Sequence, residues 1–157
     1  VEIGKEFGQK IGREYGLFVL YQMEDAEVCI VVMGSTAGTA RAAVNQLRAK
    51  GKKVGMLKLR VFRPFPFGEL AEVLSKISAV GIMDRSDGNK GLGGPLFDEI
   101  RSALYDSEKR PLTVNYIYGL GGRDITVEQI EDIFQNLLNY AQRGRVDSLV
   151  NYVGVRE

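Results

Sequence analysis

The sequence contains no histidine, and its 157 residues include a single cysteine, Cys29. The lack of an imidazole excludes Ser-His-Asp and Cys-His nucleophile pairs, His-ligated metals and a histidine general base. One thiol allows neither an intramolecular disulfide nor a cysteine-built zinc or iron–sulfur cluster within this chain. A lone thiol suits a reducing compartment, so we expect a cytoplasmic location.

Excess charge of one sign and long apolar runs are also missing. Lys and Arg total 21 and Asp and Glu total 20, so the net charge is +1. That balance provides no electrostatic footprint for nucleic acid or an anionic membrane. No apolar segment approaches the length of a membrane span, and no signal peptide is visible. We therefore expect neither nucleic acid nor a membrane as a partner. The first residue is Val rather than Met, which is typical of a processed or excised chain.

What the chain does have is a regular alternation of strand-like and helix-like segments from residue 28 onward. Residues 28–33 are uniformly apolar and mostly β-branched, as in a strand buried on both faces. Alternation of this kind indicates βαβ units, so the sequence predicts an α/β fold with three layers, α/β/α, around a mostly parallel sheet. Strands are predicted at 28–33, 54–61, 79–83 and 112–118, and helices at 39–50, 69–77, 95–105 and from a Thr126–Gln129 capping box to about 142.

Both ends of the chain give weaker patterns. Ile3, Phe7 and Ile11 recur at helical spacing and predict a short amphipathic helix within residues 1–16. Residues 17–21 form only a brief apolar run, and the pattern leaves the structure around Leu149 and Val150 undecided.

The predicted strands end in loops that meet at one edge of the sheet, where ligands or partners of parallel sheets bind. Those loops are 34–38, 62–68, 84–94 and 119–124. The first, Gly-Ser-Thr-Ala-Gly, offers backbone N–H groups to a phosphate. It matches neither G-x-G-x-x-G nor a Walker A loop, so we favour an ordinary strand-to-helix turn.

The loop Arg63-Pro64-Phe65-Pro66-Phe67 is the most unusual stretch. Its aromatic rings and prolines are typical of a stiff apolar surface that packs against another domain or subunit. The alternative is that the phenylalanines close the core of this domain. The sequence leaves both open, with Arg63 and Phe65 as the candidate interface residues.

Two further loops carry polar side chains. Asp84 could bind Mg²⁺ or act as an acid or base, but with no second carboxylate paired to it we favour a loop in which Asp84 and Arg85 make local hydrogen bonds. Gly119 to Asp124 could form an anion nest around Gly121 with Arg123 as a clamp, or a capped turn, and neither is preferred. The residues therefore contain no self-sufficient catalytic set, and we predict no catalytic, cofactor-binding or metal-binding residue.

Several sequence blocks, taken together and in order, resemble the C-terminal part of the α subunit of pyruvate:ferredoxin oxidoreductase and related 2-oxoacid:ferredoxin oxidoreductases. The resemblance covers about residues 12–138 and implies a fold like the transketolase C-terminal domain. The blocks are Glu24–Glu27, Gly34–Ser35, Leu47–Gly55, Arg63–Pro66, Gly94–Phe97 and Tyr118–Asp124.

The resemblance implies a domain of a thiamine-diphosphate enzyme that converts a 2-oxoacid to acyl-CoA and passes electrons through iron–sulfur clusters to ferredoxin. The thiamine-activating glutamate, the Mg²⁺–diphosphate motif and the cluster cysteines of that family lie outside this chain. Thiamine diphosphate, Mg²⁺ and iron–sulfur clusters are thus expected in the complete enzyme and none in this chain alone. The isolated chain is expected to be inactive.

The implied organisation is a linker or helix of a preceding domain at residues 1–24 and a transketolase C-terminal-like domain at 25–157. Its implied partners are the other α-subunit domains and β-, γ- and δ-type subunits, with ferredoxin and CoA serving the complete enzyme. Loops carrying Arg63, Phe65, Asp84, Arg85, Gly121 and Arg123 would face a neighbouring domain or subunit. The competing hypothesis is a freestanding phosphate- or nucleotide-binding α/β protein that uses the glycine loops.

Overall fold

A single mixed sheet forms the centre of the molecule. The computed structural model describes residues 2–12, 15–88 and 92–155. Within these ranges the strand order is β1-β3-β2-β4-β5-β6. Neighbours from β3 to β6 run parallel, whereas β1 pairs antiparallel with β3 at one edge. The strands are β1 (Phe18–Tyr21), β2 (Val28–Met33), β3 (Val54–Leu59), β4 (Ala79–Asp84), β5 (Leu112–Tyr118) and β6 (Val150–Val153).

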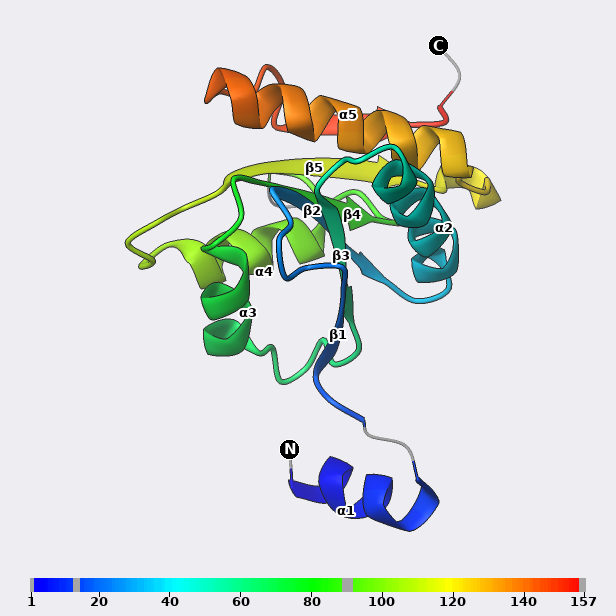
Figure 1. Ribbon diagram of the computed structural model, residues 1–157, viewed down its shortest axis with the longest axis vertical. Helices are drawn as coiled ribbons and strands as arrows, with labels where there is room; N and C mark the ends of the chain where they lie inside the picture. The colour runs from blue at the N-terminus through cyan, green and yellow to red at the C-terminus, as the bar shows by residue number, and fades with distance from the viewer. Residues whose placement is uncertain (1, 13–14, 89–91, 156–157) are drawn as a thin grey trace.

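Helices cover both faces of this sheet, which confirms the three-layer α/β/α prediction (Figure 1). One face carries α2 (Thr36–Ala49) and α5 (Val127–Arg143), which contact each other. The opposite face carries α3 (Phe67–Leu74) and α4 (Pro95–Leu104). The α5 capping box is present, because the Thr126 hydroxyl accepts from the Gln129 N–H and the Gln129 side chain accepts from the Thr126 N–H.

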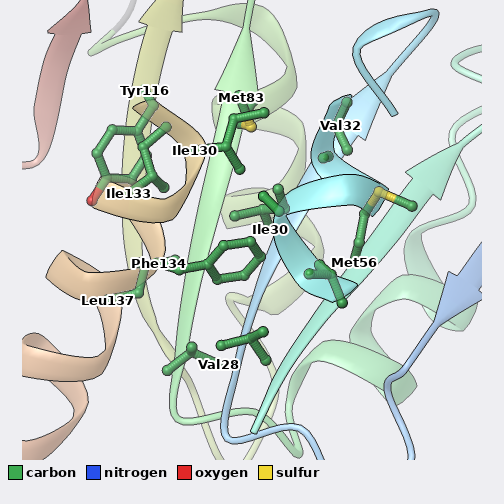
Figure 2. Packing of buried hydrophobic residues seen from close by; sticks show 14 of the residues in the cluster. Val28, Ile30, Val32, Met56, Met83, Tyr116, Ile130, Ile133, Phe134 and Leu137 are labelled. Atoms are coloured by element: carbon green, nitrogen blue, oxygen red, sulfur yellow. The ribbon is translucent and has the colours of Figure 1, made fainter. Parts of the chain in front are cut away.

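Two apolar clusters, one on each face, hold the layers together. Strands β2 and β4 are apolar along almost their whole length and bury side chains toward both clusters. Figure 2 shows the α5 side, where Phe134 projects toward Ile30 of β2. Both of these side chains are completely buried. The continuous apolar pattern of the central strands therefore reflects burial on two faces.

Both edge strands were missed or left undecided by the sequence pattern. Residues 18–21 form β1, and 150–153 form β6, each only half-buried. The predicted second strand also ends earlier than expected, at Leu59 rather than residue 61. Beyond Leu59, the N–H groups of Arg60 and Val61 both donate to the carbonyl of Leu17, next to the last β1–β3 pair.

The N-terminal helix α1 (Glu2–Ile11) confirms the predicted amphipathic helix, but its apolar side is not covered. Ile3 is 82% exposed, Phe7 53% and Ile11 44%. Figure 1 shows α1 set apart from the sheet, beyond β1. The ring of Phe7 tilts against Tyr15, with 5.8 Å between ring centroids. The helix is thus formed without the core burial that stabilises most protein helices.

Candidate functional site

The chain reverses its winding between β2 and β4. From β2 it passes through α2 to β3 on one side, and from β3 it returns through α3 past β2 to β4. Such a switch point leaves a crevice at the carboxyl ends of the two diverging strands. A cleft of about 400 Å³ lies there, and its lining includes Met33, Phe62, Met83, Arg85, Leu96 and Tyr118.

Asp84, at the end of β4, is 4% exposed and is fully engaged in hydrogen bonds. Its Oδ1 accepts from the Leu96 N–H at 2.9 Å, and its Oδ2 accepts from the Phe97 N–H at 3.2 Å. Oδ2 also accepts from Nδ2 of Asn115 at 2.9 Å. Burial raises the pKa of this carboxyl, and the three donors oppose that rise. Asp84 therefore caps the N-terminus of α4, and the prediction that it makes local loop hydrogen bonds is wrong, because its partners lie twelve or more residues away in the chain.

Asn115 completes this network and was not predicted from the sequence. It is wholly buried in β5, donates to the Ile82 carbonyl at 2.9 Å and accepts from the Gly94 N–H at 2.8 Å. A side chain at Gly94 would collide with Asp84, and one at Gly93, whose φ is +98°, with Asn115. The one signal in the sequence was a polar residue within an otherwise mostly apolar strand. The glycine pair thus permits close packing of the loop against this network.

Tyr118 and Arg85 shape the other wall of the cleft. The Tyr118 hydroxyl, nearly buried, donates to Oγ1 of Thr36 in the first turn of α2 at 2.8 Å. Burial raises the pKa of Tyr118, while Arg85 nearby acts in the opposite direction. The Arg85 guanidinium lies so close to Gly119 that a Cβ there would come within 3.0 Å of its Nε. Arg85 is exposed and forms no ion pair with a carboxylate of the described residues.

The two predicted interface residues of the Arg63–Phe67 loop differ in burial. Phe65 is 8% exposed and belongs to the core cluster on the α3–α4 side, with edge-on contacts to Phe62 and Phe67. Arg63 keeps 61% of its side chain exposed, forms an ion pair with Glu99 and lies over the Phe62 ring. The Phe65 ring therefore belongs to this domain's core, whereas Phe67, 45% exposed, and Arg63 lie at the surface.

The remaining predicted loop residues, Gly121 and Arg123, follow β5. Gly121 is exposed within a short 3-10 turn, with φ of +69°. Arg123 donates from Nη1 to the Gly154 carbonyl at 2.9 Å, which links the loop to the C-terminal strand. Residues 89–91 of the predicted 84–94 loop lie outside the described residues.

Over the described ranges, no group of three His, Cys, Asp or Glu side chains could hold a metal ion. Cys29 is completely buried in β2, and burial raises the pKa of its thiol. It therefore packs as a small apolar residue. Among the same residues there is no helix long and apolar enough to cross a membrane.

The arrangement defines a transketolase C-terminal-like α/β domain. One similar solved structure is a split-gene transketolase, described as an inactive tetramer of beta chains. The match covers 82% of this chain and 45% of that chain, with a TM-score of 0.62 and 17% identity. The 2-oxoglutarate:ferredoxin oxidoreductase of Magnetococcus marinus has a TM-score of 0.60 and 24% identity over 77% of this chain and 19% of its own. Both likenesses concern the fold alone.

The chain belongs to the pyruvate:ferredoxin oxidoreductase core domain II family, whose profile matches residues 26–130. Pyruvate synthase subunit PorA of Thermotoga maritima is 42% identical over 99% of this chain, which spans 39% of that subunit. Ketoisovalerate oxidoreductase subunit VorA of Pyrococcus horikoshii is 39% identical over 96% of this chain, which spans 38% of the relative. The chain therefore covers about two fifths of the length of these curated relatives.

Proposed function

We propose that this chain acts as a structural, subunit-contacting domain of a 2-oxoacid:ferredoxin oxidoreductase α subunit. The enzyme would decarboxylate a 2-oxoacid oxidatively, form acyl-CoA and pass the electrons to ferredoxin. The observation that carries the proposal is 42% identity across nearly the whole chain to a subunit more than twice as long. The names of the relatives include both pyruvate and ketoisovalerate enzymes, so the 2-oxoacid is left open.

The described residues do not fit a thiamine diphosphate–Mg²⁺ site. Mg²⁺ requires oxygen ligands that are free to coordinate it. The carboxylate in the cleft, Asp84, has both oxygens occupied by donors from α4 and Asn115. We therefore assign thiamine diphosphate, Mg²⁺ and iron–sulfur clusters to other parts of the enzyme, and no reaction step to this chain.

Two surfaces support a contacting role. The first is the apolar side of α1, which stands uncovered and which we assign, with residues 1–24, to a linker from a preceding domain. The second is the loop around Arg63, whose guanidinium is exposed above a rigid set of rings. Exposed apolar side chains and arginines on rigid supports are typical of protein interfaces. Other α-subunit domains and β-, γ- and δ-type subunits are the proposed partners, in the cytoplasm.

The test compares assembly of the complete enzyme with stability of the 157-residue chain. Arg63→Ala is introduced into both, and Arg101→Ala, in the last turn of α4, is the matched control. We expect Arg63→Ala to reduce co-purification of the partner subunits while leaving the urea midpoint of the chain within error. Phe65→Ala is unsuitable here because its ring is part of the core.

Equal losses of assembly and stability would overturn the assignment of Arg63 to an interface. A native α subunit that consists of these 157 residues alone would overturn the proposal as a whole. In that case, titration of the chain with inorganic phosphate and ATP would test the glycine loops as a phosphate site.

A further inference from the structure

The switch-point cleft has the dimensions and lining of a small-molecule site. Its volume of about 400 Å³ lies within the range of roughly 300–1,000 Å³ seen for ligand pockets. Apolar side chains from several elements line it, among them Met33 of β2, Met83 of β4 and Leu96 of α4. Phe62, half-buried, adds an aromatic ring from the loop after β3. An apolar body of a few carbon atoms would therefore find contacts on several sides.

The polar groups of the cleft differ in whether they make hydrogen bonds or ion pairs with other described residues. Asp84 has both carboxylate oxygens committed, and the Tyr118 hydroxyl donates to Thr36. The Arg85 guanidinium also lines the cleft, yet no carboxylate of the described residues lies within ion-pair distance of it. Arg63, the neighbouring arginine on this edge, is paired with Glu99.

The Arg85 guanidinium is exposed and lies against the loop that follows β5. Its Nε and Nη2 lie against the backbone of Gly119, where a Cβ would come within 3.0 and 3.4 Å of them. Gly119 follows β5 directly, so the guanidinium lies at the carboxyl edge of the sheet, in the same cleft lining as Tyr118. A guanidinium offers a planar fork of donors that matches a carboxylate, and a partly apolar setting strengthens such a pair.

We propose that this cleft binds a small organic acid, with its carboxylate on Arg85 and its apolar body against the partly exposed Met33 and Phe62. A neutral ligand would leave Arg85 without its counter-charge. An anion without an apolar part, such as phosphate, would leave the methionine and phenylalanine walls uncovered. The inference concerns the 157-residue chain itself and does not depend on the oxidoreductase assignment.

The methionines of the chain provide internal probes and controls. Met33 and Met83 line the cleft, but Met83 is only 2% exposed and belongs, like Met56, to the core cluster under α2 and α5, while Met23 packs near Gly55. With ¹³C-labelled methionine methyl groups, we expect hexanoate to shift the Met33 and Met83 signals saturably at millimolar concentrations. Met23 and Met56 are expected to stay in place. Hexanamide, which has the same body without the charge, is expected to bind more weakly.

The role of Arg85 is tested by Arg85→Gln, with Arg145→Gln as the matched control. Arg145 is exposed and lies between α5 and β6, at the opposite edge of the sheet. Loss of one charge-assisted pair predicts a weakening of hexanoate binding by about tenfold or more. Arg145→Gln is expected to leave it unchanged, and hexanamide binding is expected to be equal in all three proteins.

Three results would overturn the proposal. The first is the absence of any Met33 or Met83 shift with hexanoate at tens of millimolar. The second is a hexanoate affinity that Arg85→Gln leaves unchanged. The third is a set of shifts that spreads equally over all four methionines, since that would indicate non-specific binding.

Discussion

Helices α5 and α1 have the same kind of amphipathic pattern but opposite surroundings. In α5 the apolar residues Ile130, Ile133, Phe134, Leu137 and Leu138 are all buried against the sheet and α2. In α1 the equivalent spacing places Ile3, Phe7 and Ile11 in solvent. Periodicity therefore predicts that a helix forms and which side is apolar. It does not tell whether that side is covered by the same domain, and in α1 that side stays largely exposed.

The largest expected effect is the removal of an α5 core ring. Phe134→Ala should lower the free energy of unfolding by about 3–5 kcal/mol, because it removes a fully buried ring and leaves a cavity. Phe7→Ala, the matched change in α1, should stay within about 0.5 kcal/mol. Urea unfolding of both variants measures the difference.

Comparable losses in the two helices would show that α1 is an integral part of this core, against the comparison above. If Phe134→Ala does not fold, Ile133→Val is the graded replacement. That change should lower the free energy of unfolding by about 0.5–1.5 kcal/mol.

The second effect concerns how helices begin. Helix α4 is capped by Asp84 from another element, whereas α5 is capped by its own Thr126. Asp84→Ala should lower the free energy of unfolding by about 3 kcal/mol, which is more than the loss of a local cap. The reason is that two backbone N–H groups and the Asn115 amide would lose their buried acceptor. Asp98→Ala, an exposed carboxylate in the first turn of α4, is the control. Equal, small losses in both variants would contradict a capping role for Asp84.

The third effect is the loss of the N-cap of α5. Thr126→Ala removes the hydroxyl that accepts from Gln129 and should lower the free energy of unfolding by about 1 kcal/mol. Thr126→Ser, which keeps the acceptor, should recover most of this loss. A serine variant as unstable as the alanine variant would place the importance of Thr126 in its methyl group.

The smallest effect is a pH dependence in the turn between β1 and β2. The Arg48 guanidinium beside Asp25 holds the pKa of that carboxyl below its usual value. The pair thus stabilises the fold above the ordinary aspartate pKa, and its contribution is lost as the pH falls through the lowered value. The gap in urea midpoint between the native chain and Asp25→Asn should therefore be present at neutral pH and close in acid. A gap of constant size over that range would show that Asp25 acts without its charge.

The sequence indicated the central strands and helices well because their signals are local. Val28–Met33 is continuously apolar, and Thr126 with Gln129 is a complete capping box within four residues. Edge strands β1 and β6 were not recognised because four half-buried residues carry no clear alternation. Asn115 was missed because its partners, Ile82, Asp84 and Gly94, are all more than twenty residues away in the chain.

By itself, the sequence determined the α/β class and the family resemblance. These follow from residue types and from periodicities that a single segment already contains. Only the tertiary structure decided that Phe65 is buried in the core, that Asp84 caps α4 and that Arg85 lines a cleft, with no ion pair to a carboxylate of the described residues. The physical reason is that burial and hydrogen bonding of these side chains depend on segments brought together by the winding of the sheet. The local sequence does not indicate that Asp84 is buried while the adjacent Arg85 is exposed.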